Sequence, residues 1–294
     1  AVAVQRRMQA EQDEAERHHA GRQAQRLLGH RGKWANRPHR LFGFGRNGRD
    51  ERLTARRHVS RQLQRVDQMV VEVRVALLDL NGEALQKVAS ELESVGAEVM
   101  ALTVDLSERE AVDSAIRQVA EQFGAIDILV NNAGFAIPAE IDSDAYGQSW
   151  DASLAVMATA QAWAIRAALP SLRRSPNPRV VNVASTEAHG ATRFNSAYVV
   201  AKHASMGLTR AMAVDLGKEG ITVNCVCPGP VRTGITDAIP EEAKQTFANR
   251  RTVLRRYGDP EEVAHATLSL VLPAASFITG AALVVDGGVT IRNA

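Results

Sequence analysis

Three side chains in the second half of the chain have the types and the spacing that proton transfer requires. Ser185 lies thirteen positions before Tyr198, and Lys202 follows that tyrosine at i+4. Side chains four residues apart on a helix share a face, so we expect the Lys202 ammonium to lie beside the phenol. Because a positive charge stabilises phenolate, we expect the pKa of Tyr198 to fall below its usual value of about 10. Tyr198 is therefore a candidate general acid or base for interconverting a carbonyl and an alcohol, and Ser185 is a candidate hydrogen-bond donor to the substrate oxygen.

The elements that would position these residues alternate between strand and helix. Short apolar runs are typical of strands buried in a parallel sheet, and segments with helical spacing of apolar residues separate them. The predicted strands are 73–80, 98–104, 126–130, 179–183, 221–226 and 282–285, and the predicted helices are 83–95, 107–123, 146–172, 197–217 and 260–272. Ser107 and Glu110 predict a capping box for the second helix. The pattern predicts an α/β fold with a doubly wound parallel sheet, which binds ligands at the carboxyl ends of its strands.

Residues 1–72 are a different kind of sequence. Residues 1–73 hold 15 arginines and one lysine against eight acidic residues, a net charge of +8, whereas the rest of the chain has a net charge of −6. The segment could be a basic arm that replaces the first strand–helix unit, or a targeting extension, although its acidic cluster at 11–16 argues against a transit peptide. It could also be an out-of-frame translation of that unit. We favour this third explanation, because the composition changes abruptly near Val73.

Further motifs occur in order along residues 73–294. With Ser185, Tyr198 and Lys202 they are Asp79, Asp105-Leu106, Asn131-Asn132-Ala133-Gly134, Pro228-Gly229 with Thr233, Thr279-Gly280 and Asp286-Gly287-Gly288. Over this range the sequence resembles the short-chain dehydrogenase/reductase family. The resemblance implies a Rossmann-like domain and an NAD(P)(H)-dependent oxidoreductase that interconverts a secondary alcohol and a ketone by hydride transfer. It suggests a small-molecule substrate, of the kind used by 3-oxoacyl reductases or by polyol and cyclic-alcohol dehydrogenases.

The resemblance also implies a role for each matching residue. Tyr198 would exchange the proton, Ser185 would polarise the carbonyl, and Lys202 would lower the tyrosine pKa and hold the nicotinamide ribose. The other cofactor-binding residues would be Asp105 and Leu106 beside the adenine, Asn132, Ala133 and Gly134 along the cofactor, and Pro228, Gly229, Val231 and Thr233 around the nicotinamide amide. Asp79 would bind the adenosine ribose and repel a 2′-phosphate, which favours NAD over NADP. Alternatively, Asp79 only caps a turn.

Two departures from the family pattern point to an alternative function. Met157 stands where the family usually has an asparagine that helps a water relay protons from the lysine, and a thioether cannot relay a proton. The relay would be either rerouted or weakened, and if it is missing we expect slower turnover but not total inactivity. The glycine-rich turn that should hold the pyrophosphate is not recognisable, because Gly43, Gly45 and Gly48 lie too far before Asp79 to form that fingerprint. The alternative is a catalytically impaired family member that acts as a binding or regulatory protein.

The loops that would contact the substrate are less informative. Glu187, His189, Arg193 and Asn195 lie between the serine and the tyrosine, and they could line a polar substrate pocket or be ordinary loop residues. Substrate specificity would also depend on a loop at 233–248.

Other patterns bear on the environment and the partners. Cys225 and Cys227 are the only cysteines and lie in an apolar run, which indicates core positions, no disulfide and a reducing compartment. No metal site, membrane span or signal peptide is predicted, so we expect a cytoplasmic location. The basic segment contains no nucleic-acid-binding motif. The family resemblance suggests a homotetramer or a homodimer.

Overall fold

The computed structural model describes residues 2–7 and 72–292, and within these ranges the chain forms a seven-stranded sheet. The strand order is β3-β2-β1-β4-β5-β6-β7. The strands are β1 (Val2–Arg7), β2 (Glu72–Asp79), β3 (Glu98–Thr103), β4 (Ile128–Asn131), β5 (Arg179–Val183), β6 (Thr222–Pro228) and β7 (Ala282–Val285). β2 pairs with β3 in parallel, and so do the successive pairs from β4 to β7. This arrangement confirms the predicted Rossmann-like α/β fold.

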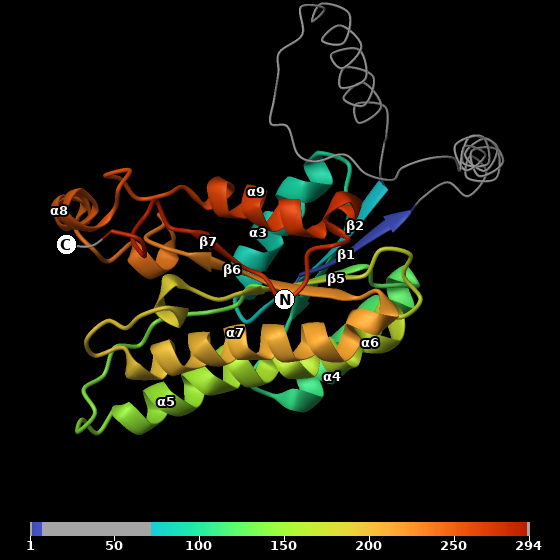
Figure 1. Cartoon of the computed structure of the whole chain (residues 1–294). Coiled ribbons are helices and arrows are strands. Elements are labelled where there is room, and N and C mark those ends of the chain that lie inside the picture. The colour runs from blue at the N-terminus through green and yellow to red at the C-terminus, as the bar shows by residue number, and fades with distance from the viewer. Residues whose placement is uncertain (1, 8–71, 293–294) are drawn as a thin grey trace, which may run out of the picture. The chain divides into compact units, whose positions relative to one another are not determined.

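Helices cover both faces of the sheet (Figure 1). They are α3 (Gly82–Ser94), α4 (Arg109–Phe123), α5 (Tyr146–Leu154), α6 (Ala160–Leu172), α7 (Ser196–Leu216), α8 (Glu241–Arg251) and α9 (Pro260–Val271). Leu129 and Val180 pack in one core cluster with α4, α6 and α7, whereas their neighbours Ile128 and Val181 pack with Leu270 of α9. Successive strand residues point to opposite faces, so a strand covered on both sides must be apolar throughout. This explains the short apolar runs of the sequence.

The first strand runs in the opposite direction to its neighbour. Val2 pairs with Val130 and Val4 with Ile128 in antiparallel register. Val2 therefore lies level with the carboxyl end of β4, and β1 ends at the other edge of the sheet. A fully parallel sheet was predicted, but the observed sheet is mixed at its centre. The reason is that β1 lies between β2 and β4 and runs antiparallel to β4.

Most predictions for the basic segment fall outside the described residues. Gly43, Gly45 and Gly48 are among residues 8–71, and so is nearly all of the segment. Residues 1–5 and 73–294 form one compact unit, which contains every candidate site residue. The boundary near residue 72 and the out-of-frame origin stay predictions.

The observed boundaries of the helices and strands agree closely with those predicted from the sequence, with two exceptions. β5 and β7 begin and end at the predicted residues. The capping box predicted at Ser107 is wrong, because the backbone N–H and the hydroxyl of Ser107 both donate to Asp105 Oδ1 (2.8 and 2.6 Å) and Glu108 is the N-cap of α4. Helix α8 was not predicted, since its range was assigned to the substrate loop.

The helical region predicted at 146–172 changes its winding in the middle. α5 and α6 are joined by a π-helical turn, η1 (Ala155–Thr159). Such turns contain one extra residue and occur frequently at functional sites. In the part of the chain that the structure describes, 146–172 is the one helical stretch long and apolar enough to cross a membrane. Here Ile165 and Leu172 pack in the core against α4 and the sheet, so the stretch is a core helix of this domain.

Candidate active site

The structure brings the three candidate catalytic residues together at the carboxyl end of β5. Ser185 is buried just beyond the strand, and its Oγ accepts a hydrogen bond from the backbone N–H of Glu187 (3.2 Å). Tyr198 lies in the first turn of α7, and Lys202 lies one turn later. Lys202 Nζ is 5.5 Å from the centre of the Tyr198 ring and donates to the carbonyl oxygen of Val183 (2.8 Å). The ammonium is thus anchored to the strand that leads to Ser185.

Burial determines the protonation of this site. Lys202 is 3% exposed, and the loss of hydration lowers its pKa to about 8. Burial raises the pKa of Tyr198, the neighbouring Ser185 hydroxyl lowers it in part, and the charge of Glu187 raises it further. The prediction of a lowered tyrosine pKa is therefore wrong, because desolvation of the phenolate dominates and the ammonium is directed to the Val183 carbonyl. Tyr198 carries its proton at neutral pH, which is the state that a proton donor requires.

Met157 lies in the π-turn η1 and borders the lysine. Its side chain is completely buried. A Cβ atom built on Gly134 would lie 3.3 Å from Lys202 Nζ and 3.3 Å from Met157 Sδ, so the sulfur and the ammonium border the same backbone position. A thioether is only a weak hydrogen-bond acceptor. Met157 therefore adds to the apolar surroundings of Lys202 and offers no route for its proton.

Replacing Met157 by asparagine is expected to raise the pKa of Lys202 and to raise turnover roughly tenfold. An amide oxygen can accept a bond from the ammonium and offset part of its desolvation, and an amide can hold a water molecule that passes on a proton. The pH dependence of kcat for the alcohol–ketone reaction measures both effects. Met157→Leu is the matched control, because it keeps the volume without adding an acceptor. Equal profiles for the two variants would show that the relay plays no part.

Two carboxylates lie at the carboxyl ends of β2 and β3, Asp79 as the last residue of β2 and Asp105 two residues after β3. Asp79 is exposed, and its Oδ1 accepts a hydrogen bond from the backbone N–H of Asn81 (2.9 Å). Asp79 therefore does cap the turn, while it stays accessible to a ligand. The bonds from Ser107 hold the pKa of Asp105 below its usual value. The backbone N–H of Val104 donates to the carbonyl oxygen of Asp79 (2.9 Å), which keeps the two strand ends side by side.

β4 ends in a buried asparagine, and an exposed asparagine begins the turn that follows it. Asn132 is exposed at the edge, whereas Asn131 is buried and its Nδ2 donates to Oδ1 of Asn182 in β5 (2.8 Å). Nδ2 of Asn182 donates in turn to Oγ1 of Thr209 in α7 (2.9 Å). This network was not predicted from the sequence. The signal was an asparagine inside an otherwise apolar strand, since a buried amide requires partners.

The loop after β6 is fixed by contacts along its length. The backbone N–H of Gly229, next to Pro228, donates to the carbonyl oxygen of Val285 in β7 (3.0 Å). Val231 is buried and forms an isolated bridge with the loop before α9. Thr233 begins a short turn, η4 (Gly234–Thr236), in which its backbone N–H donates to Oγ1 of Thr236 (3.1 Å). The four residues predicted to surround the nicotinamide amide are therefore held in a defined conformation.

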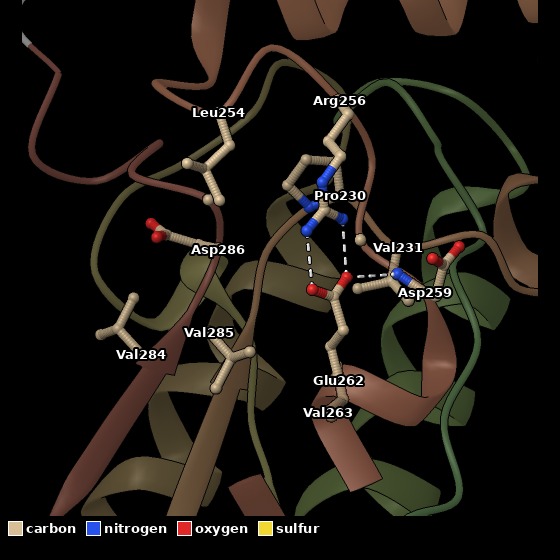
Figure 2. A pocket seen from close by; sticks show the side chains of 12 residues that line it. Pro230, Val231, Leu254, Arg256, Asp259, Glu262, Val263, Val284, Val285 and Asp286 are labelled. Carbon is tan, nitrogen blue, oxygen red and sulfur yellow. Dashed lines mark hydrogen bonds and ion pairs between the residues drawn. The ribbon is translucent and has the colours of Figure 1, made fainter. Parts of the chain in front are cut away.

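A cavity of about 250 Å³ lies next to this loop (Figure 2). Pro230, Val231 and Asp286 line it, and Arg256 and Glu262 face each other at its side. The guanidinium of Arg256 donates two hydrogen bonds of 2.7 Å to the carboxylate of Glu262. The cavity is formed by the ends of β6 and β7 and the start of α9, and the candidate catalytic residues do not line it.

The groups along this edge of the sheet fit a nicotinamide dinucleotide in part. Acceptor and donor groups stand at the ends of β3, β2, β4, β5 and β6, and Leu106 after β3 and Ala133 after β4 line one small cavity together with residues of α6. The backbone N–H of Ala184 donates to the carbonyl oxygen of Val226 (2.8 Å), which brings the end of β6 beside Ser185. These residues suit the adenosine and nicotinamide ends. β1 ends at the opposite edge, so a cradle for the pyrophosphate is not formed by the described residues.

Comparison with known proteins agrees with this architecture. A family model described as enoyl-(acyl carrier protein) reductase matches residues 70–290. Meso-2,3-butanediol dehydrogenase of Serratia marcescens is 38% identical over 219 residues, which cover 74% of this chain and 85% of the relative.

Solved structures of short-chain dehydrogenases and reductases are also similar to this chain in fold. The L-sorbose reductase of Gluconobacter frateurii, complexed with NADPH and L-sorbose, superposes with a TM-score of 0.69 at 27% identity, covering 74% of this chain and 87% of that one. A mutant short-chain dehydrogenase/reductase of Serratia marcescens superposes with a TM-score of 0.68 at 34% identity, covering 73% and 86%. The chain therefore belongs to the short-chain dehydrogenase/reductase family of oxidoreductases.

Proposed function

We propose that this protein interconverts a secondary alcohol and a ketone with a nicotinamide cofactor. The observation that carries the proposal is the convergence of a protonated Tyr198 phenol, the Ser185 hydroxyl and the anchored Lys202 ammonium at one strand end. The similarity to a butanediol dehydrogenase and a sorbose reductase supports a small hydroxylated substrate.

Each of the three residues would have a separate role in the reaction. When bound, the nicotinamide supplies or accepts the hydride. In the reducing direction the phenolic O–H of Tyr198 would donate its proton to the carbonyl oxygen, and Ser185 would donate a hydrogen bond to the same atom. One N–H of the Lys202 ammonium is used on Val183, which leaves two donors for the hydroxyls of a ribose. In the oxidising direction Tyr198 must be deprotonated, so its raised pKa favours this reaction at higher pH.

In this proposal, Asp79 affects whether the protein uses NAD or NADP. Its accessible carboxylate supports NAD, because it would repel a 2′-phosphate. The similar L-sorbose reductase is complexed with NADPH, so NADP is supported at least as well by the comparisons.

Replacing Asp79 by serine is expected to shift kcat/KM toward NADP relative to NAD by about tenfold. The substitution removes the charge that opposes the 2′-phosphate, and a serine can still cap the turn. Steady-state kinetics with both cofactors measure the shift. Glu83→Gln removes a nearby charge in the first turn of α3 and serves as control. An unchanged ratio would show that Asp79 does not contact the adenosine ribose.

The proposed activity is tested by a panel of alcohols and ketones with NAD(H) and NADP(H), together with fluorescence titration of NADH and NADPH. Turnover of a secondary alcohol supports the proposal. Cofactor binding without turnover of any substrate would overturn it in favour of a binding or regulatory protein. Absence of both cofactor binding and turnover would also overturn the proposal.

Self-association and a cytoplasmic location stay predictions. Exposed apolar side chains on α9, on β7 and between them are compatible with a contact between copies of the chain there. They include Leu268, Phe277, Ile278 and Leu283.

A further inference from the structure

The segment between Ser185 and Tyr198 contains two buried acceptor oxygens. Glu187 lies in a short turn, η2 (Thr186–Ala188), and Asn195 is the N-cap residue of α7. Within the described residues, neither Oε2 of Glu187 nor Oδ1 of Asn195 has a hydrogen-bond partner, although both atoms are buried. Buried acceptors without donors are rare, because their desolvation is not compensated. Both oxygens therefore suit a donor that a ligand supplies.

Glu187 is fixed beside the reaction centre. Its backbone N–H donates to Oγ of Ser185 (3.2 Å), and its Oε1 accepts a hydrogen bond from Oγ1 of Thr192 (2.8 Å). Its charge acts on the phenol of Tyr198. The position of Oε2 relative to the serine and the tyrosine is therefore set by the backbone and by the partner of the other carboxylate oxygen.

The conformation of the loop keeps the nearby cation away from this carboxylate. The guanidinium of Arg193 lies 4.2 Å from the centre of the Phe194 ring and forms no ion pair with Glu187. Phe194 has a φ of 66°, which is uncommon for a residue other than glycine, and its carbonyl oxygen accepts a hydrogen bond from the N–H of Ala139 (2.8 Å). Backbone strain of this kind persists where the surrounding structure imposes it, and it clusters at ligand sites.

We infer that Glu187 selects the substrate: its Oε2 accepts a hydrogen bond from a hydroxyl on the carbon next to the reacting carbon. The inference rests on the proposed function and names its substrate class, vicinal diols and α-hydroxy ketones. A carboxylate only accepts hydrogen bonds, so a carboxylic-acid substrate is repelled and a plain secondary alcohol leaves Oε2 unpaired. A site with a buried polar group discriminates strongly against an analogue that lacks the partner.

The test compares kcat/KM for 2,3-butanediol, 2-butanol and 3-hydroxybutyrate in the full-length protein. The wild type is expected to prefer the diol over 2-butanol by about 100-fold and to use the hydroxy acid worst. In Glu187→Leu the ratio of kcat/KM for the diol to that for 2-butanol is expected to fall to within a few fold of unity. Glu187→Gln keeps the shape and one acceptor, and gives an intermediate preference. Glu140→Gln, an exposed carboxylate in the loop after β4, is the control and leaves the preference unchanged.

The outcomes separate this inference from the proposed function. A diol preference that is absent in the wild type, or that survives in both Glu187→Leu and Glu187→Gln, overturns the inference alone, since both alcohols are still oxidised. Failure of the wild type to oxidise any alcohol with either cofactor overturns the proposed function and the inference with it. Circular dichroism shows whether Glu187→Leu is folded. If this variant is not folded, the diol preference of the conservative variant Glu187→Gln decides the test.

Discussion

Replacing Tyr198 by phenylalanine is expected to lower kcat on the order of 10³-fold in both directions, with little change in cofactor affinity. A positioned proton donor contributes roughly 10²–10⁴-fold, and Ser185 cannot replace it because its hydroxyl is far less acidic than a phenol. The wild-type rate of alcohol oxidation should rise with pH, since burial raises the pKa of Tyr198 and the phenolate is the base. This pH dependence should disappear in the variant.

The matched control for this substitution is Tyr146→Phe. The hydroxyl of Tyr146 lies 3.0 Å from Oγ of Ser196, at the start of the same helix, but it takes no part in the proposed reaction. We expect a less than threefold change in kcat for this control. If Tyr198→Phe kept more than a tenth of the wild-type activity, another group would have to supply the proton and the proposed mechanism would be wrong.

Replacing Gly229 by alanine is expected to destabilise the protein by about 3 kcal/mol, the upper end of the range for overpacking. A Cβ atom at this position would lie 2.6 Å from Cβ and 2.7 Å from Cα of Asp286. The obstacle is the backbone of the loop after β7, which is itself tied by bonds from Gly288 and Thr290 to the Asp286 carboxylate, so it cannot move cheaply. Chemical denaturation measures the loss.

Gly147→Ala is the control: it makes the same chemical change at a position where we expect the opposite effect on stability. Gly147 lies inside α5 with no heavy atom near the position of a Cβ, so alanine should stabilise the helix by about 0.5–1 kcal/mol. If Gly229→Ala were as stable as the wild type, the loop after β7 would have to move without loss, and the conformation of the predicted amide-binding loop would not depend on this contact.

Much of the domain could be predicted because its signals are local and agree with each other. β7 is a short apolar run followed at once by Asp286, and β5 has apolar residues at three of its five positions, with Ser185 two residues beyond its end. Tyr198 and Lys202 come together because helical spacing alone places them on one face, and Ser185 joins them because its strand ends beside that helix.

The features that the sequence did not predict depend on how deeply a side chain is buried and on which of several hydrogen-bond partners it binds. The spacing of Tyr198 and Lys202 contains no information on burial, and burial reverses the expected direction of the tyrosine pKa. Ser107 was expected to cap α4, but the carboxylate two residues earlier binds it instead. Helix α8 was missed because it has no apolar face, although Glu241 and Glu242 in its first turn and Arg250 and Arg251 in its last turn match the helix dipole.

The buried amides of Asn131 and Asn182 have a further consequence for how the site assembles. The two residues lie directly opposite each other in the pairing of β4 with β5. The remaining residues of these strands are mostly branched apolar side chains, so burial alone distinguishes poorly between the native alignment and one displaced by two residues. In a displaced alignment Nδ2 of Asn131 would lose its acceptor and Oδ1 of Asn182 would lose its donor, at about 1–3 kcal/mol for each buried group. The amide pair therefore selects the alignment in which the ends of β4 and β5 lie level, so that Asn132 and Ser185 stand at the same edge of the sheet, and a contact that never touches substrate helps to position the site.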